Sequence, residues 1–352
     1  MESTMRTDKM TLTDYEIQNS LAKLDHFLLQ LDENINWDRV KKTLEPLDPS
    51  RKNVAGRDSY EPLKMFKVML LQSWYDLSDP EMEFYLNTNL LFMSFCRFSI
   101  SESKPDHSTI CRWRNRVAES GMFDLIFSGI MTELQELGLE IRQGKMVDAT
   151  LVKAHARPNR KVVVETEPTG DDEQAAIPTY EASEVVVKES CDPDANWVKK
   201  GKVCTYGYKA HTMTDSNGIV VCMDVTSANV HDTVMFPDLI DKAQLSEGDT
   251  VYADKGYHSE QNKEILERRK LTDRIMHKRK RNEPENETIV NRNKSISKRR
   301  YVVERTFGSL KRSYGWSRTR YIGLPKTTFY LQMRCLAFNI KRAIKLISLS
   351  PV

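Results

Sequence analysis

The pattern of apolar residues along the chain changes near Gly138, and this change limits the folds that are possible. Before Gly138, apolar residues recur at helical spacing over residues 12–47, 62–75, 79–90 and 108–120. After Gly138, strand-like runs alternate with helix-like runs. The 352 residues suffice for two domains. We therefore expect an all-α N-terminal domain at residues 1–137 and an α/β domain at residues 138–352.

The elements expected after Gly138 follow the order of an RNase H-like domain. A strand at 143–152 holds Asp148, and strands at 206–214 and 219–226 are joined through Asn217-Gly218, a strong hairpin signal. The remaining elements are a helix near His231, a strand at 250–254, a helix at 259–269, a strand near 274–276, a helix around Glu304 and a last helix at 326–347. The predicted fold class is α/β, with a mixed sheet flanked by helices.

Composition excludes several classes of protein. With 39% hydrophobic and 29% charged residues, the chain is typical of a globular protein. Its longest apolar runs are far short of the roughly 20 residues of a membrane span, and its first residues are polar, unlike a secretion signal. The six cysteines form no Cys-x-x-Cys pair, which argues against a zinc site or a disulfide framework. A cytoplasmic, nucleoid-associated protein without a membrane partner is expected.

Charge is distributed unevenly, although the formal net charge is only +3. Residues 268–345 hold 23 Lys or Arg and five acids, a balance of 23 − 5 = +18. Residues 165–194 hold ten acids and one lysine, a balance of 1 − 10 = −9. The basic region predicts a polyanionic partner, above all nucleic acid; a solvated charged surface is the alternative. The acidic residues lie in an expected surface insertion at about 160–200, either a passive loop or a screen over the basic face.

A basic helix is expected in the N-terminal domain at residues 108–120. Asp106 or Ser108 can cap this helix, which leaves Arg112 and Arg114 free to reach outward. Such a helix fits the second helix of a helix-turn-helix, whose basic side chains contact phosphates and base edges. The alternative is an ordinary surface helix that binds nothing.

A single carboxylate, Glu304, stands among six basic residues in the stretch 298–312. If this stretch is helical, Arg300, Glu304 and Lys311 share one face. The neighbouring face is a buried apolar stripe, formed by Val303, Phe307, Leu310 and Tyr314. One interpretation of Glu304 is a surface ion pair with Arg300, worth roughly a few tenths of a kcal/mol. The other is a metal-binding carboxylate whose neighbouring cations hold DNA phosphates.

Two further carboxylates support the metal interpretation. Asp148 and Asp254 are expected on strands, and Glu304 on a helix packed against them. Taken alone, Asp148 can be interpreted as a strand-end side chain that bonds to the backbone, and Asp254 as a residue that forms a turn. Together, three carboxylates from separate elements suit hard divalent cations, which prefer oxygen ligands. Two such ions about 4 Å apart can activate a water or a 3′-hydroxyl and stabilise the leaving oxygen of a phosphodiester.

Several motifs carry a resemblance to a known family. They are Val147-Asp148-Ala149-Thr150, Tyr206-Gly207-Tyr208-Lys209-Ala210-His211, Ala228-Asn229-Val230-His231-Asp232, Ala253-Asp254-Lys255-Gly256-Tyr257 and Val303-Glu304-Arg305-Thr306-Phe307-Gly308. In these motifs, and over most of its length, the chain resembles the DDE transposases of bacterial and archaeal insertion sequences, of the InsH type. Residues 56–126 also resemble the helical domain that precedes catalysis in that family. The resemblance implies that Asp148, Asp254 and Glu304 hold two Mg²⁺ ions, for which Mn²⁺ can substitute.

The family's helix signature, Tyr-x2-Arg-x3-Glu-x6-Lys, implies that Arg300 and Lys311 bind DNA around the scissile bond. Ser297 stands at the tyrosine position, a departure that concerns the binding of end DNA. Because 304 − 254 = 50 residues separate the last two carboxylates, the large β insertion of some relatives does not fit here. His211 and His231 also match family motifs. Each has a simpler interpretation, as a core-facing strand residue and as a neighbour of a helix cap, and neither is placed in the catalytic set.

The expected function is that of a transposase that binds the inverted repeats of its own element. It would cleave double-stranded DNA there and join the freed ends to target DNA, with a homodimer holding the two ends in the synaptic complex. One alternative is a catalytically inactive DNA-binding repressor derived from such an element. Another is an RNase H-like nuclease that cuts without requiring inverted repeats.

Overall fold

The computed structural model describes residues 11–48, 59–141, 144–156, 191–279 and 286–348. Its α-helices are α1 (Leu12–Leu21), α2 (Phe27–Asn34), α3 (Trp37–Leu44), α4 (Pro62–Tyr75), α5 (Asp79–Thr88), α6 (Leu90–Phe95), α7 (His107–Ser120), α8 (Phe123–Glu136), α9 (Phe236–Lys242), α10 (Glu260–Arg268), α11 (Glu287–Ser313) and α12 (Leu324–Ser348). Its strands are β1 (Lys145–Lys153), β2 (Asn196–Lys200), β3 (Val203–Thr214), β4 (Val220–Ser227), β5 (Thr250–Ala253) and β6 (Thr272–Ile275). Short 3₁₀ helices are η1 (Glu45–Leu47), η3 (Asp232–Met235) and η4 (Lys255–Tyr257).

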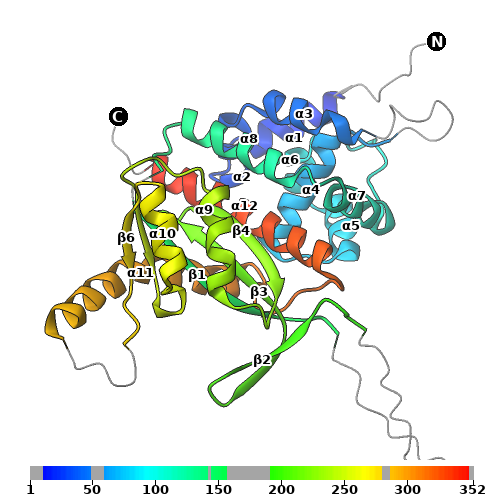
Figure 1. Ribbon diagram of the computed structural model, residues 1–352. Helices are drawn as coiled ribbons and strands as arrows, with labels where there is room; N and C mark the ends of the chain where they lie inside the picture. The colour runs from blue at the N-terminus through cyan, green and yellow to red at the C-terminus, as the bar shows by residue number, and fades with distance from the viewer. Residues whose placement is uncertain (1–10, 49–58, 142–143, 157–190, 280–285, 349–352) are drawn as a thin grey trace, which may run out of the picture.

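The N-terminal half is helical, as expected, and packs around α4 (Figure 1). Nearly every residue of α4 is buried, because α3, α5, α7 and α12 all contact it. The helix expected at 79–90 ends earlier, at Thr88. Asn89 separates α5 from α6, since its Oδ1 accepts hydrogen bonds from the backbone N–H groups of Leu91 and Phe92 and so caps a new helix. Helices α6 and α8 were not among the expected elements.

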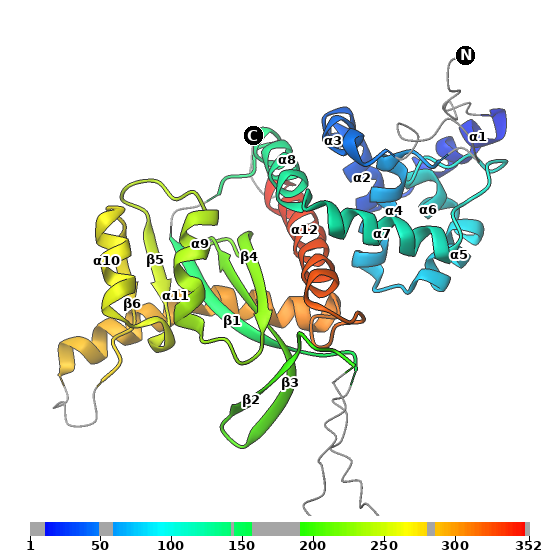
Figure 2. The ribbon, with the colours of Figure 1, turned by 45° about the vertical axis from the view of Figure 1, so that its right-hand side comes forward.

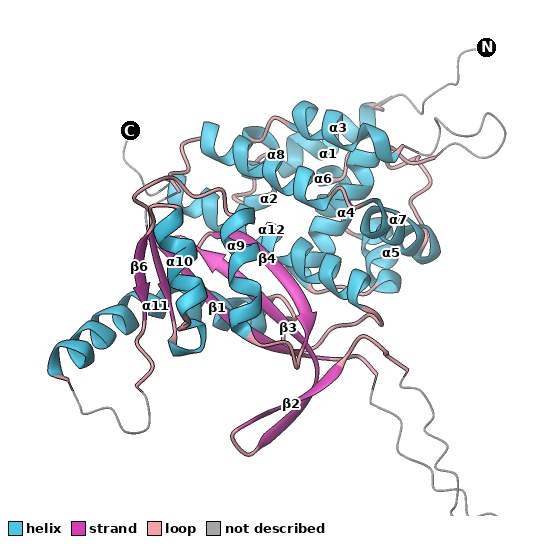
Figure 3. Cartoon of the chain, in the orientation of Figure 1, coloured by secondary structure: helices cyan, strands magenta, loops and turns pink. Residues whose placement is uncertain are grey.

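The C-terminal half is a mixed sheet flanked by helices, which confirms that expectation (Figure 3). The strand order is β2-β3-β1-β5-β6, and β4 pairs with β3. β1 runs antiparallel to β3 and parallel to β5, and β5 runs parallel to β6. Helices α9 and α10 cover one face, where Val147 and Met213 pack against Phe236 and Leu266. Helices α11 and α12 cover the other face.

Helix α12 packs against both halves of the molecule (Figure 2). The indole N–H of Trp74 on α4 donates to the backbone carbonyl of Ala337 over 2.8 Å. Two residues further along α12, the Asn339 side chain exchanges hydrogen bonds with the backbone of Val220 on β4. One hydrophobic core therefore runs from the helical half through α12 to the sheet.

Three further expectations concern single segments. Most of the insertion expected at about 160–200 falls on residues 157–190, outside the described residues, but its end is strand β2, which we did not anticipate. No disulfide joins any of the six cysteines, all of which lie among the described residues. Among the described residues, no helix is both long and apolar enough to span a membrane.

Candidate active site

Asp148 lies on β1, on the sheet face that α11 covers. In the antiparallel register it stands opposite Thr212 on β3. In the parallel register Met146 stands opposite Tyr252 on β5. Two residues further along each chain segment, Asp148 is therefore level with Asp254. Side chains two residues apart on a strand share a face. The two aspartates therefore emerge side by side where β5 ends.

The Asp148 carboxyl group is only partly exposed and is surrounded by charge. Its Oδ1 accepts from the N–H of Ala149 over 2.9 Å, and its Oδ2 lies 2.9 Å from Nη2 of Arg300. Burial raises the pKa of Asp148 to about 6, although the Arg300 guanidinium acts to lower it. The carboxylates of Asp254 and Glu304 also act to raise the pKa. The carboxylates of Asp254, which follows β5, and of Glu304, on α11, are thus within electrostatic range of Asp148.

Asp254 caps the short helix η4, directly after β5. Its Oδ1 accepts a hydrogen bond of 2.6 Å from the N–H of Gly256, which fixes the direction of the carboxylate. A Cβ atom on Gly256 would lie 2.8 Å from this same oxygen. A side chain at this position would therefore displace the carboxylate, which gives a physical reason for glycine in the Asp-x-Gly-Tyr motif.

Glu304 lies on α11, and the apolar stripe expected beside it is buried in full. The surface ion pair with Arg300, one of the two interpretations of Glu304, is not formed. Arg300 is buried and pairs with Asp148 instead, whereas Glu304 is exposed and forms no salt bridge with any described residue. Glu304 thus keeps a free carboxylate on the helix face toward Asp148. Lys311, two turns further along α11, is half-buried, and burial lowers its pKa.

Carboxylate oxygens are the ligands that hard divalent cations prefer, so the donor chemistry of Asp148, Asp254 and Glu304 fits such ions. The arrangement as it stands does not enclose one. Within the described part of the chain, no three Asp, Glu, His or Cys side chains gather closely enough to hold a metal ion. One oxygen of Asp148 is instead occupied by Arg300. Metal binding by these three residues would require the carboxylates to lie closer together than they do here.

A fourth carboxylate, Asp232, lies beside this group, and the sequence analysis did not assign it a role. Its Oδ2 would lie 3.8 Å from a Cβ on Gly256, so Asp232 and Asp254 flank the same glycine. The adjacent Thr233 hydroxyl donates to the Gly256 carbonyl over 2.8 Å. Burial, then the charges of Asp232, Asp148 and Asp254, raise the pKa of the Tyr257 hydroxyl well above its usual value. The His231-Asp232 motif was the available signal, but only the fold brings it against the Asp254 turn.

The two motif histidines take structural positions. His211 is adjacent to Thr212 on β3, so it points to the opposite sheet face from Asp148. It is buried with its Nε2 2.9 Å from the Thr226 hydroxyl, and burial lowers its pKa to about 4. His231 caps η3, where its Nδ1 accepts from the N–H of Thr233.

The two arginines of α7 differ from each other. Arg112 is exposed, and its guanidinium contacts the Ser108 and Thr109 hydroxyls one turn earlier. Arg114 does not reach outward as expected. It is buried, pairs with Asp79 and stacks on the Tyr321 ring, with 5.0 Å from its guanidinium carbon to the ring centroid.

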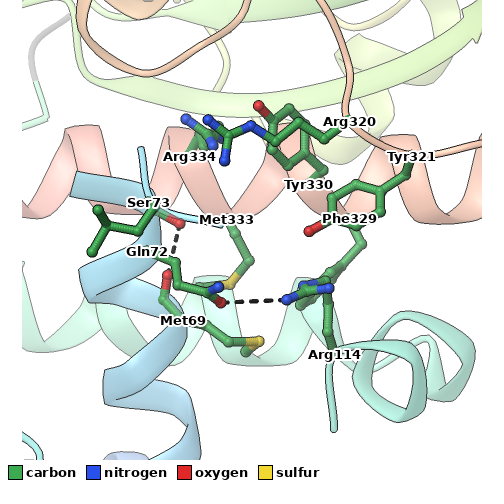
Figure 4. Close-up of a pocket in the computed structure, with 11 residues that line it drawn as sticks. Met69, Gln72, Ser73, Arg114, Arg320, Tyr321, Phe329, Tyr330, Met333 and Arg334 are labelled. Atoms are coloured by element: carbon green, nitrogen blue, oxygen red, sulfur yellow. Dashed lines mark hydrogen bonds between the residues drawn. The ribbon is translucent and has the colours of Figure 1, made fainter. Parts of the chain in front are cut away.

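Arg114 also lines a cavity of about 30 Å³ where α4, α7 and α12 meet (Figure 4). Arg320 and Arg334 line the same cavity, and both pair with Asp76. The cavity has room for about two waters. These arginines therefore connect the helical half to α12.

Comparisons with known proteins show which family the chain resembles. Residues 141–340 match the family model described as Transposase DDE domain, and residues 16–116 match the one described as Transposase domain (DUF772). The transposase for insertion sequence element IS1106 of Neisseria meningitidis serogroup B is 34% identical over 239 residues, which cover 67% of this chain and 78% of that protein.

A solved piggyBac transposase synaptic complex with hairpin DNA is similar at 12% identity and a TM-score of 0.45, over 97% of this chain and 77% of that one. The DDE model alone covers more than half of the chain, and enzymes of this family generally use divalent metal ions. The chain belongs to the DDE transposases of insertion sequences.

Proposed function

We propose that this transposase binds the ends of its element as double-stranded DNA, cleaves them and transfers the strands, using Asp148, Asp254 and Glu304. One observation carries the proposal: Asp148 and Asp254 emerge side by side on the sheet face that α11 covers, and Arg300 of α11 pairs with Asp148. Burial raises the pKa of Asp148, the charges of Asp254 and Glu304 act in the same direction, and Arg300 opposes them. A carboxyl group whose pKa is raised by burial and by neighbouring carboxylates is a feature of catalytic centres. The proposed catalytic domain is RNase H-like and spans 138–352.

The three carboxylates would hold two divalent cations, Mg²⁺ or, in its place, Mn²⁺, which activate a water or 3′-hydroxyl and stabilise the leaving oxygen. Asp254 is held in place by its own turn through Gly256. Arg300 neutralises Asp148 in the resting protein and is released to a DNA phosphate when the carboxylates close. Lys311 lies on the same helix, and its lowered pKa reflects a site poor in water, where a phosphate gains most from a nearby cation.

DNA-end recognition is assigned to the helical half, residues 1–137, where Arg112 is exposed on α7. Arg114 would join it only if the Asp79 pair opened. Two copies of the chain would hold the two ends in a synaptic homodimer in the cytoplasm, at the nucleoid. This division of labour rests on the position of α7 and on the excess of basic residues in 268–345.

The test is Mg²⁺-dependent cleavage of a duplex that carries one element end, with a random duplex in parallel. Asp254→Asn should abolish cleavage while DNA binding and the unfolding midpoint stay unchanged, because asparagine still caps η4 but removes an anionic ligand. The loss should exceed about 100-fold, the upper range for partners that only support a metal ligand. Asp238→Asn, an exposed change on α9, is the matched control.

Each alternative function predicts a different result. Equal cleavage of both duplexes would indicate the nuclease. End binding without cleavage by the unaltered chain would indicate the repressor. Wild-type cleavage by the Asp254→Asn variant would refute the site.

A further inference from the structure

Strands β2 and β3 form a hairpin that extends beyond the rest of the sheet (Figures 1 and 2). The β2–β3 register runs from Asn196 opposite Gly207 to Lys200 opposite Val203. β1 joins β3 only from Gly207 onward and β4 only from Tyr208 onward. Residues 203–206 therefore have β2 as their sole strand neighbour within the described sheet. At about 3.4 Å per residue, the hairpin projects roughly 20 Å from Gly207 to its tip.

A tight turn holds the two strands in register. Because Lys200 stands opposite Val203, only Gly201 and Lys202 form the loop. Gly201 has φ +63°, a conformation that favours glycine and that a type II′ turn requires at its first loop position. This turn matches the twist of paired strands. The hairpin is therefore a defined ribbon with a fixed set of side chains on each face.

The hairpin has no core behind its tip. Residues 199–204 are all exposed, and the exposed fractions of Trp197 and Val203 are 55% and 65%. The Trp197 ring packs against the facing Tyr206 ring, at a centroid distance of 5.4 Å. A two-stranded hairpin exposed on both faces contributes little to folding stability. Its exposed aromatic side chain is better explained by a binding partner than by the fold.

The charge of the hairpin has one sign. Lys199, Lys200 and Lys202 surround the tip, and the sequence from 195 to 208 contains no acid. None of the three lysines forms a salt bridge with any residue in the described ranges. The ribbon thus presents three exposed ammonium groups next to an indole ring.

The positive charge continues from the hairpin toward the catalytic helix. The charge of Lys200 adds to burial in lowering the pKa of Lys311 on α11, so the two ammonium groups are within electrostatic range. At the base of the hairpin, Lys153 on β1 stands opposite Gly207 on β3. The backbone of Lys153 also forms an isolated β-bridge with the backbone of Arg318. Lys153 and Arg318 are both exposed. A basic strip therefore extends from the α11 side of the site to the hairpin tip.

We propose that the β2–β3 hairpin is an arm that enters a groove of double-stranded DNA beside the scissile phosphate. A two-stranded ribbon fits the major groove of B-DNA, about 12 Å wide. Lysines 199, 200 and 202 contact phosphates along the groove walls, and the Trp197 ring packs against the sugars. A second copy of this chain is a poorer occupant, because symmetric pairing of two such ribbons would bring lysines against lysines. This inference rests on the proposed function, because the duplex that the arm enters is the DNA that the proposed active site cuts.

The test compares two full-length triple variants that each lose three positive charges. The arm variant is Lys199→Ala, Lys200→Ala, Lys202→Ala. The control is Lys263→Ala, Arg268→Ala, Lys270→Ala, on and just after α10 and thus on the opposite sheet face from α11. Affinity for a fluorescent random-sequence duplex is measured across a salt titration. Each lost phosphate contact lowers the slope of log K against log salt by about 0.9, so the arm variant should lose about 2 to 3 in slope and the control none.

Trp197→Ala should weaken binding at every salt concentration and leave the slope unchanged, because it removes no charge. Unfolding midpoints of the arm variants should match the parent, since residues 199–202 lie outside the core. A slope for the arm variant equal to that of the parent would overturn the proposal. The proposal would also be overturned if the arm variant kept the parent's slope but lost self-association in sedimentation, because the hairpin would then be an interface between copies of the chain.

This experiment and the test of the proposed function can fail separately. The arm is judged by binding to random duplex alone, whereas the proposed function is judged by cleavage. A parent chain that binds with a slope dependent on the arm but never cuts end DNA in Mg²⁺ would refute the proposed function and support the arm.

Discussion

Arg300 and Asp148 are 152 positions apart in the sequence and form an ion pair of 2.9 Å in the fold. The pair joins helix α11 to strand β1 at the point where Asp254 and Glu304 approach Asp148. Both side chains are largely buried, at 8% and 18% exposure. Breaking such a pair by removing one partner leaves an uncompensated charge in the interior. In the proposed site, this pair would be the resting arrangement, in which a guanidinium balances the charge of Asp148 before metal and DNA bind.

The raised pKa of Asp148 predicts a pH dependence of stability in the metal-free protein. The folded pKa, about 6, lies above the ordinary value near 4, so the folded state binds more protons than the unfolded state between these values. Stability should therefore fall as pH rises from 4 to 6, by at most about 3 kcal/mol from this group. Mg²⁺ should oppose the trend, because carboxylate ligands bind metal only when deprotonated.

The measurement is chemical unfolding in chelator at several pH values, with Asp148→Asn as the variant. As pH rises through this window, the stability of the variant should improve relative to the parent. Asp238→Asn, the exposed control on α9, should follow the parent throughout. A constant difference between parent and Asp148→Asn from pH 4 to 7 would contradict the raised pKa.

Gly256→Ala should reduce cleavage without unfolding the protein. The new Cβ would lie 2.8 Å from Oδ1 of Asp254, closer than real contacts allow, and the carboxylate must move. Because a small displacement of a group at the reacting centre slows the reaction strongly, we expect the cleavage rate to fall by about 10- to 100-fold. Gly129→Ala on α8 is the control, since its Cβ meets only the Thr43 hydroxyl at 3.6 Å, an ordinary contact. Equal cleavage by the two variants would show that the Asp254 turn tolerates a side chain.

The sequence predicted the elements that carry the site more reliably than the contacts between them. Helical spacing identified the buried stripe of α11, because that pattern reports the period of the helix itself, and strand-like runs marked β1 and β5. Resemblance in short motifs then selected Asp148, Asp254 and Glu304. The pairing of Arg300 with Asp148 was missed, since a neighbour four residues away on the same helix was the only partner that local spacing offered.

Contacts between distant segments account for the other differences. Arg114 was expected to reach solvent because α7 alone shows it on a polar face. In the fold, Asp79 of α5 and Tyr321 of the segment before α12 cover it. Strand β2 was missed because its residues are exposed on both faces and so show no alternation of apolar and polar residues. Only its pairing with β3 defines it.

The two arginines of α7 should respond differently to removal. Arg114→Ala leaves Asp79 without its partner and removes the contact to Tyr321, so we expect a loss of about 2–4 kcal/mol in unfolding free energy. Arg112→Ala should change stability by less than about 0.5 kcal/mol. It should instead weaken binding to end DNA and lower the salt slope by about 1. Denaturant unfolding measures the stability effect, and a salt titration of DNA binding measures the binding effect. If Arg114→Ala lowered the salt slope and Arg112→Ala lowered stability, Arg114 would be the DNA contact.

The acidic stretch 165–194 ends directly before the basic hairpin in sequence, and this order sharpens its predicted effect. The net charge of this stretch is 1 − 10 = −9. If this negative charge screens the basic surface, deleting residues 166–190 should tighten binding to random duplex at low salt. The gain should shrink as the Debye length falls below about 10 Å. The same deletion in the Lys199→Ala, Lys200→Ala, Lys202→Ala background should tighten binding less, because fewer cations remain to be screened. Equal affinities of the deletion and the parent across the titration would leave the stretch a passive loop.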